Sequence, residues 1–244
     1  MRFAGRPAST GGLPNPRTDP IAQLRLKHIL RELLDEWRLE EIAEMAARRK
    51  RVLGSLVSLT YDADPQIRWR AVEAVGAAAS RVAEDDPDQV REHLRRLLWL
   101  MSEESGAICW HAPEAMAEIV LRQPKVFAEY IPIVVTLIEN LAEEDLEHFK
   151  AGTLRAIGRL GALAGDRVRE VTPAVTSALR DSDPQVRGMA VWCLNEVGSA
   201  GLLADHPELL SDEGTVDLYE DGRLVRTTVS RLVRGALADG SAEG

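Results

Sequence analysis

Apolar residues recur at every fourth position in four stretches of this chain. A step of four keeps the apolar side chains of each stretch on one face of a helix over two turns. The four stripes are Ile67, Ala71 and Val75; Ile108, Ala112 and Met116; Phe149, Thr153 and Ile157; Val186, Ala190 and Leu194. Successive stripes begin 41, 41 and 37 residues apart, a period typical of stacked helix pairs. We expect the first residue of each stripe to be buried.

Helix starts are also marked in the sequence. The first and fourth stretches open on the same phrase, Asp-x-Asp-Pro-Gln, in which Asp64 and Asp183 can cap a helix and the following proline suits its first position. A further helix is expected before each stripe, over residues 39–60, 87–101, 124–141 and 166–180. Pro132 and Pro173 lie inside two of these first helices and should kink them.

The phrase Asp-Pro-x-Val-Arg-x-x-Ala-Val-x-x-Leu/Val-Gly resembles HEAT repeats, in particular the short bacterial type found in phycobilisome lyases. The resemblance covers residues 39–199 and is strongest in the first and fourth copies. The second copy has Ser105-Gly106 in place of Asp-Pro and Cys109 in place of Arg, and the third has Leu146-Glu147. The resemblance implies an all-α superhelix of four HEAT-like helix pairs, an α-α solenoid whose second helices line a concave surface. It implies no particular function.

The pattern changes near the C-terminus. Residues 215–219 and 223–227 alternate apolar and polar side chains on either side of Asp221-Gly222, which is a strong signal for a β-hairpin. Residues 228–238 then predict a short helix. We expect residues 200–244 to cap the last repeat, as repeat arrays require. The alternative is that the hairpin offers an edge to a partner strand.

The N-terminal end differs from the repeats as well. Residues 1–20 contain four prolines and three glycines and are expected to be a disordered tail. Residues 21–38 predict an amphipathic helix that caps the first repeat, and its mixed charge argues against a membrane surface. The chain shows neither an apolar signal core nor a run of eighteen apolar residues, so we expect no membrane contact.

Charge narrows the range of partners. The formal net charge is −9, and residues 181–244, with 5 basic and 12 acidic side chains, account for −7 of it. A nucleic-acid surface needs a basic stripe, so we expect none. The basic run at residues 48–51 spreads around a helix and is expected to be a solvated flank. The two cysteines, Cys109 and Cys193, suggest no disulfide framework, which favours the cytoplasm.

The candidate binding surface comes from aligning the second helices in columns. Trp69 and Trp110 share one column, and Glu73, Glu114 and Arg155 share another that should form one exposed face. Aromatic rings beside charges are typical of binding hot spots, although large rings at repeat junctions also serve as packing. The predicted partner-binding residues are Trp69, Arg70, Glu73, Trp110, His111, Glu114, Glu118, Arg155 and Trp192.

Two chemical alternatives depend on the same helix. His111, Glu114 and Glu118 share a helical face that could in geometry hold a metal, but the chain lacks the His-Glu dyads of the di-iron HEAT enzyme deoxyhypusine hydroxylase. Cys109 beside His111 could be an activated thiol or a bilin attachment site. We therefore predict a non-enzymatic protein-binding scaffold without metal or cofactor. The alternative is an enzyme or pigment-lyase-like protein centred on Cys109, His111 and Glu114.

Overall fold

The computed structural model describes residues 20–101, 109–141 and 146–242. The predicted tail over residues 1–20 therefore lies almost entirely outside the described residues, as does Ile108. The helices are α1 (Pro20–Asp35), α2 (Leu39–Arg48), α3 (Arg51–Leu59), α4 (Pro65–Ala83), α5 (Pro87–Met101), α6 (Ala112–Arg122), α7 (Tyr130–Asn140), α8 (Lys150–Leu160), α9 (Arg167–Ser177), α10 (Pro184–Glu196) and α11 (Val229–Ala242). Short 3₁₀ segments are η1 (Glu147–Phe149), η2 (Gly161–Ala164), η3 (Ala178–Arg180), η4 (Ala200–Asp205) and η5 (Pro207–Ser211). The strands are β1 (Thr215–Glu220) and β2 (Arg223–Thr228).

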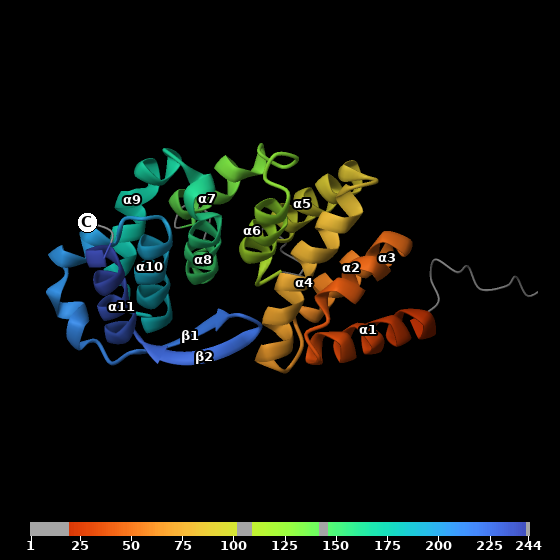
Figure 1. Cartoon of the computed structure of the whole chain (residues 1–244), viewed down its shortest axis with the longest axis horizontal. Helices are drawn as coiled ribbons and strands as arrows, with labels where there is room; N and C mark the ends of the chain where they lie inside the picture. The colour runs from red at the N-terminus through yellow and green to blue at the C-terminus, as the bar shows by residue number, and fades with distance from the viewer. Residues whose placement is uncertain (1–19, 102–108, 142–145, 243–244) are drawn as a thin grey trace, which may run out of the picture.

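The helices stack in two rows, which confirms the predicted all-α solenoid (Figure 1). Helices α4, α6, α8 and α10 pack side by side in one row, and α3, α5, α7 and α9 form the other. We call the face of α4, α6, α8 and α10 that is turned away from α5, α7 and α9 the inner face. None of the helices described is both long and apolar enough to cross a membrane.

The core lies between the two rows and follows the four apolar stripes. Every described residue of the stripes is buried, including Ile67, Phe149 and Val186. The helix starts are also as predicted: Asp64 accepts a 2.8 Å hydrogen bond from the backbone N–H of Gln66, and Asp183 accepts the equivalent bond from Gln185. Local spacing and capping therefore determine this part of the structure.

Residues 39–60 form two helices, where the sequence predicted one. Helix α2 ends at Arg48, and Arg49 is extended. In α2 the buried residues are Ile42 and Ala46, so a continuous helix would bring Arg49 or Lys50 to the core face. The break keeps these cations in solvent and lets α3 restart its apolar face at Val52.

The predicted helix over residues 124–141 was also wrong at its start. Turns occupy residues 124–129, with Phe127 fully buried, and α7 begins only at Tyr130. This start places Pro132 in the first turn, where its missing N–H costs no hydrogen bond, so Pro132 has no interior bond to break. Pro173 does lie inside α9, as predicted.

The C-terminal hairpin is confirmed. Strands β1 and β2 pair antiparallel, with Glu220 opposite Arg223. The two turn residues, Asp221 and Gly222, have φ values of 46° and 73°, which is the geometry of a type I′ turn. The following helix, α11, extends to Ala242, beyond the predicted end at residue 238, and packs on α10.

Candidate functional site

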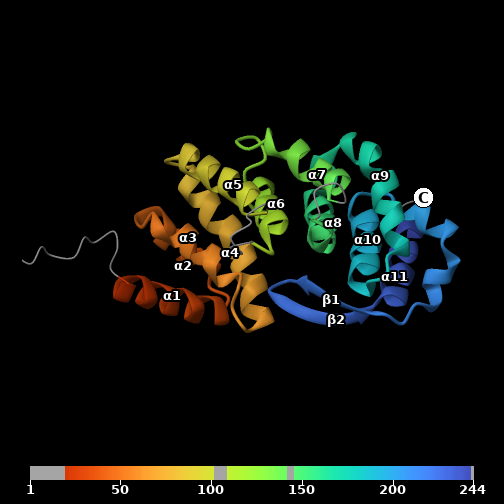
Figure 2. The same cartoon turned by 180° about the vertical axis from the view of Figure 1, so that it is seen from behind.

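The hairpin lies across the inner face of the array. Its base lies beside α10, and the hairpin extends from there until its tip meets α4 (Figures 1 and 2). At the tip, a Cβ atom at Gly222 would overlap the indole ring of Trp37, so only glycine fits there. The C-terminal hairpin thus contacts the loop that follows the first helix.

Arginine side chains hold the hairpin main chain in place. Arg155 of α8 donates from Nη2 to the carbonyl of Tyr219 at 2.6 Å. Arg70 of α4 donates from Nε to the carbonyl of Gly222 at 2.9 Å and from Nη1 to the carbonyl of Leu34 at 3.0 Å. Arg70 therefore joins the hairpin tip, α4 and the end of α1.

Aromatic rings surround the guanidinium of Arg155. It lies 4.8 Å from the ring centre of Trp69, 5.1 Å from that of Trp192 and 5.9 Å from that of Tyr219. Trp69 and Tyr219 stack at 5.7 Å with their planes 12° apart. Burial lowers the pKa of Arg155, and desolvated cation–π contacts of this kind stabilise a buried cation.

Glu73 of α4 joins three parts of the chain. Its Oε2 accepts a 2.6 Å hydrogen bond from the hydroxyl of Tyr219 and a 2.9 Å bond from the indole of Trp37, while Oε1 lies 3.8 Å from Arg122. Burial, and then the Glu73 carboxylate, raise the pKa of Tyr219 well above its usual range. The hairpin, the first loop and α6 therefore meet at one carboxylate.

The hairpin leaves two hollows beside it on the inner face. The larger has a volume of about 600 Å³ and is lined by Trp37, Glu73, Glu118, Arg155, Arg159, Trp192, Glu196, Tyr219, Glu220 and Asp221. The smaller, of about 330 Å³, is lined by Trp69, Trp110, His111, Glu114, His148, Ala151, Gly152, Arg155, Gln185, Met189 and Asp217. Eight of the nine predicted partner-binding residues line one hollow or the other, and Arg70 holds the hairpin tip.

The predicted exposure of these residues was wrong in part. Glu114 and Arg155 are only 3% and 5% exposed, so they do not share an exposed face with Glu73. Glu118 and Trp192 are also buried. The hairpin covers Arg155 and Trp192 directly through its main chain and Glu220, a contact that columns of helix positions do not include. Trp69, Arg70, Glu73 and His111 are half-buried, and Trp110 is 53% exposed.

Most polar side-chain atoms around α6 pair with protein side chains, whereas Oε2 of Glu114 is buried without a hydrogen-bond partner. His111, the residue before α6, lies with Nδ1 3.0 Å from Oε1 of Glu114. Glu118 accepts from Arg159 at 2.7 and 3.2 Å. The residues described contain no group of three or more His, Cys, Asp or Glu side chains placed to hold a metal ion.

Cys109 does not have the surroundings of a nucleophile. Its side chain is fully buried, and its Sγ lies 4.0 Å from the hydroxyl of Thr60. Burial raises the pKa of the Cys109 thiol, whereas reactive thiols are exposed and have a lowered pKa. The other cysteine, Cys193, is buried too, and burial raises its pKa to about 12.

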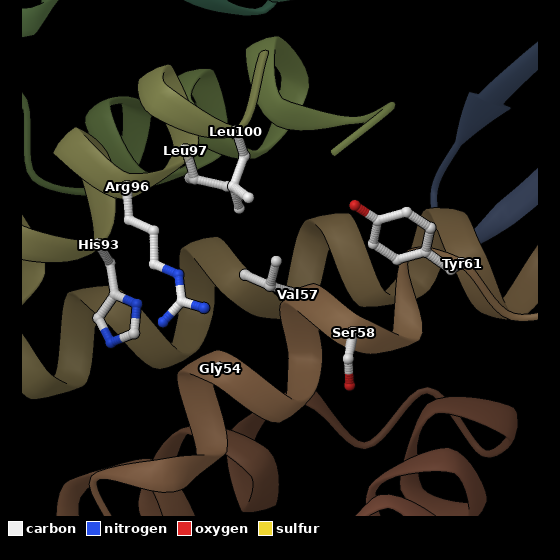
Figure 3. Close-up of a pocket in the computed structure, with 8 residues that line it drawn as sticks. All are labelled: Gly54, Val57, Ser58, Tyr61, His93, Arg96, Leu97 and Leu100. Carbon is white, nitrogen blue, oxygen red and sulfur yellow. The ribbon is translucent and has the colours of Figure 1, made fainter. Parts of the chain in front are cut away.

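A third hollow lies on the other side of the array, between α3 and α5 (Figure 3). Its volume is about 290 Å³, and His93 and Arg96 of α5 border it opposite Gly54, Val57 and Ser58 of α3. None of the predicted partner-binding residues lines it.

Comparison with known proteins agrees with this architecture. The family profile of the HEAT-like repeat matches residues 147–197, which include all of α8, α9 and α10. Residues 147–197 of the chain are therefore similar to a HEAT-like repeat. The other helix pairs of the array stack beside this one in the same two rows.

Two similar proteins span most of this chain. An uncharacterized protein of Archaeoglobus fulgidus is 28% identical over 185 residues, which cover 73% of this chain and 91% of that protein. A solved structure of a designed armadillo repeat protein in complex with the peptide (KR)4 is similar over 88% of this chain and 98% of its own, at 19% identity and a TM-score of 0.42.

Proposed function

We propose that this HEAT-like protein is a non-enzymatic binding scaffold for another protein, and that the partner contacts the inner face beside the hairpin. The observation that carries the proposal is Trp110, which is 53% exposed at the smaller hollow. Its indole lies edge-on to His148 at 4.9 Å and 6.2 Å from Phe149, so packing orients one side of the ring while solvent reaches the rest. Exposed aromatic clusters beside a hollow are typical of interaction sites.

The hairpin reduces the surface that a partner can reach. Of the predicted residues, Trp69, Trp110 and His111 border the smaller hollow and remain accessible at least in part. Glu114 and Arg155 then support this surface from below, since both are buried.

Both described cysteines are free and buried, which is consistent with a reducing compartment such as the cytoplasm.

The test compares two exposed tryptophans. Trp110→Ala removes the proposed contact, and Trp99→Ala is the matched control, because Trp99 is 59% exposed on α5 of the other row. Immobilised wild-type and variant proteins are incubated with extract of the native cell, and the retained partner is purified and titrated by calorimetry. We expect Trp110→Ala to weaken binding by more than about 1 kcal/mol, with Tm nearly unchanged.

Trp99→Ala should bind like the wild type. A Trp110→Ala protein that melts much earlier but binds with unchanged affinity would show that the ring is only packing between repeats. A partner that binds both variants equally would rule out the inner face beside Trp110 as the contact surface.

A further inference from the structure

Two glutamines at equivalent positions of the repeats form hydrogen bonds with the main chain of the hairpin. Gln66 and Gln185 follow the Asp-Pro of the first and fourth repeats. The side-chain amide of Gln185 donates to the carbonyl of Asp217 at 3.0 Å and accepts from its N–H at 2.9 Å. Gln66 donates to the carbonyl of Gly222 and accepts from the N–H of Leu224 at 2.9 Å. Equivalent positions of two distant repeats thus make the same kind of contact.

These contacts recognise an extended backbone. In β1, alternate residues direct their N–H and C=O groups away from β2, and the carbonyls of Asp217 and Tyr219 are bound in this way by Gln185 and Arg155. Hydrogen bonds to main-chain groups hold an extended segment whatever its side chains are, as in peptide recognition by strand-like binding. The inner face therefore has the contacts of a peptide groove.

One hairpin side chain adds specificity. The ring of Tyr219 stacks on Trp69, and its hydroxyl donates to Glu73, so the site fits a tyrosine and has a carboxylate to receive its hydroxyl. Buried polar groups that are built to bond a hydroxyl discriminate strongly against residues that lack one.

We propose that the inner face is a groove for an extended, tyrosine-containing polypeptide segment, and that the hairpin tip is its built-in occupant. A partner binds by replacing the tip with such a segment of its own. The proposal rests on the function proposed above only in taking the inner face as the binding side.

The structure divides the hairpin into a fixed base and a separable tip. At the base, a Cβ atom at Gly188 of α10 would overlap the side chain of Val216, so strand and helix are in close contact. Val229 at the start of α11 is fully buried. The tip, residues 219–224, is held by polar contacts with Gln66, Arg70 and Glu73 and by stacking of Tyr219 on Trp69. A competing segment that carries a tyrosine can make the same contacts.

The experiment uses the full chain with its tip loosened. Tyr219→Ala combined with Gly222→Val removes the hydroxyl and stacking contacts and places a branched side chain at a φ of 73° against Trp37. The probe is a fluorescein-labelled peptide with the sequence of residues 214–229. Fluorescence anisotropy should show that the loosened variant binds this peptide at least tenfold more tightly than the wild type does.

Four controls make the result specific. Hydrogen exchange should be at least tenfold faster at the amides of the tip in the loosened variant, which confirms release. A probe peptide with alanine in place of its tyrosine should bind at least fivefold more weakly, and Gln66→Ala in the loosened variant should weaken binding of the original probe similarly. Circular dichroism checks folding; if the double variant does not fold, Gly222→Val alone takes its place.

A released tip without peptide binding would overturn the proposal, as would equal binding of the tyrosine and alanine peptides. Trp110 makes no contact with the hairpin tip among the interactions described. The Trp110→Ala result and the peptide result can therefore succeed or fail independently, which separates this inference from the proposed function.

Discussion

Replacing Tyr219 by phenylalanine removes one oxygen atom from the contact between the hairpin and α4. The hydroxyl lies 2.6 Å from Oε2 of Glu73, and Tyr219 is 5% exposed. Hydrogen bonds to charged groups contribute about 1.5–3 kcal/mol. The Glu73 side chain is 19% exposed and keeps its bond from Trp37, so its charge stays solvated. We therefore expect Tyr219→Phe to lower the free energy of unfolding by about 1.5 kcal/mol.

Urea denaturation measures this difference, and Tyr130→Phe is the matched control. Tyr130 is also buried, and its hydroxyl donates to the carbonyl of Arg91 at 3.5 Å, a long bond to a neutral acceptor, and interacts as well with the exposed side chain of Arg95. Its loss should cost about 0.5 kcal/mol. Equal losses in the two variants would contradict the assignment of Glu73 as the acceptor that secures the hairpin.

The same pair has a defined pH dependence. Burial and Glu73 raise the pKa of Tyr219 in the folded state above its ordinary value. A raised pKa stabilises the fold below the unfolded pKa of about 10, and this contribution is lost as the pH rises above it. The stability difference between wild type and Tyr219→Phe should therefore shrink above about pH 10. A constant difference from pH 8 to 11 would refute this linkage.

Two further predictions concern the repeats. Phe149→Ala should lower the free energy of unfolding by about 3 kcal/mol in urea melts, because Phe149 is 1% exposed; a loss well under 1 kcal/mol would contradict its place in the core. Arg187, at 2.7 and 3.1 Å from Asp212, holds the pKa of that carboxyl below its usual range. This stability is present above the unfolded pKa of about 3.9 and is lost as the pH falls through the lower folded pKa. Acid melts of Asp212→Asn should therefore show a shallower loss of stability below about pH 4 than the wild type does.

The repeats were predictable because their determinants are local. Helical periodicity alone places the stripe residues on the core-facing side of each helix. The cap of α4 involves only Asp64 and the backbone N–H of Gln66, two residues later. The errors were local as well. The break at Arg49 follows from cations at core-facing positions, and the late start of α7 follows from Pro132; both signals were present in the sequence but were read as features of a continuous helix.

The candidate site was only partly predictable, for a different reason. The columns correctly brought the predicted residues to one face, since most of them line the two hollows. The burial of Arg155 and Trp192 depends on where a hairpin from the other end of the chain lies. Glu73 meets Tyr219 across 146 residues, and Gln66 meets Leu224 across 158. Helical periodicity relates residues a few positions apart, so it cannot predict contacts across such sequence separations.

Two sequence features nevertheless correspond to this contact. The repeated Asp-Pro was interpreted as a helix start, and the glutamine after it was left without a role, although Gln66 and Gln185 both bind the hairpin. Asp221-Gly222 was interpreted only as the turn of a hairpin, although Gly222 also has to leave room for Trp37. Two otherwise diverged copies have a glutamine at the same position, and the predicted hairpin has outward-facing main-chain groups on both strands. Together these features favour a contact between glutamine and backbone over a solvated side chain. On that reasoning the hairpin belongs to the inner face as much as to the C-terminal cap, and any partner of this surface has to fit around the hairpin or replace its tip.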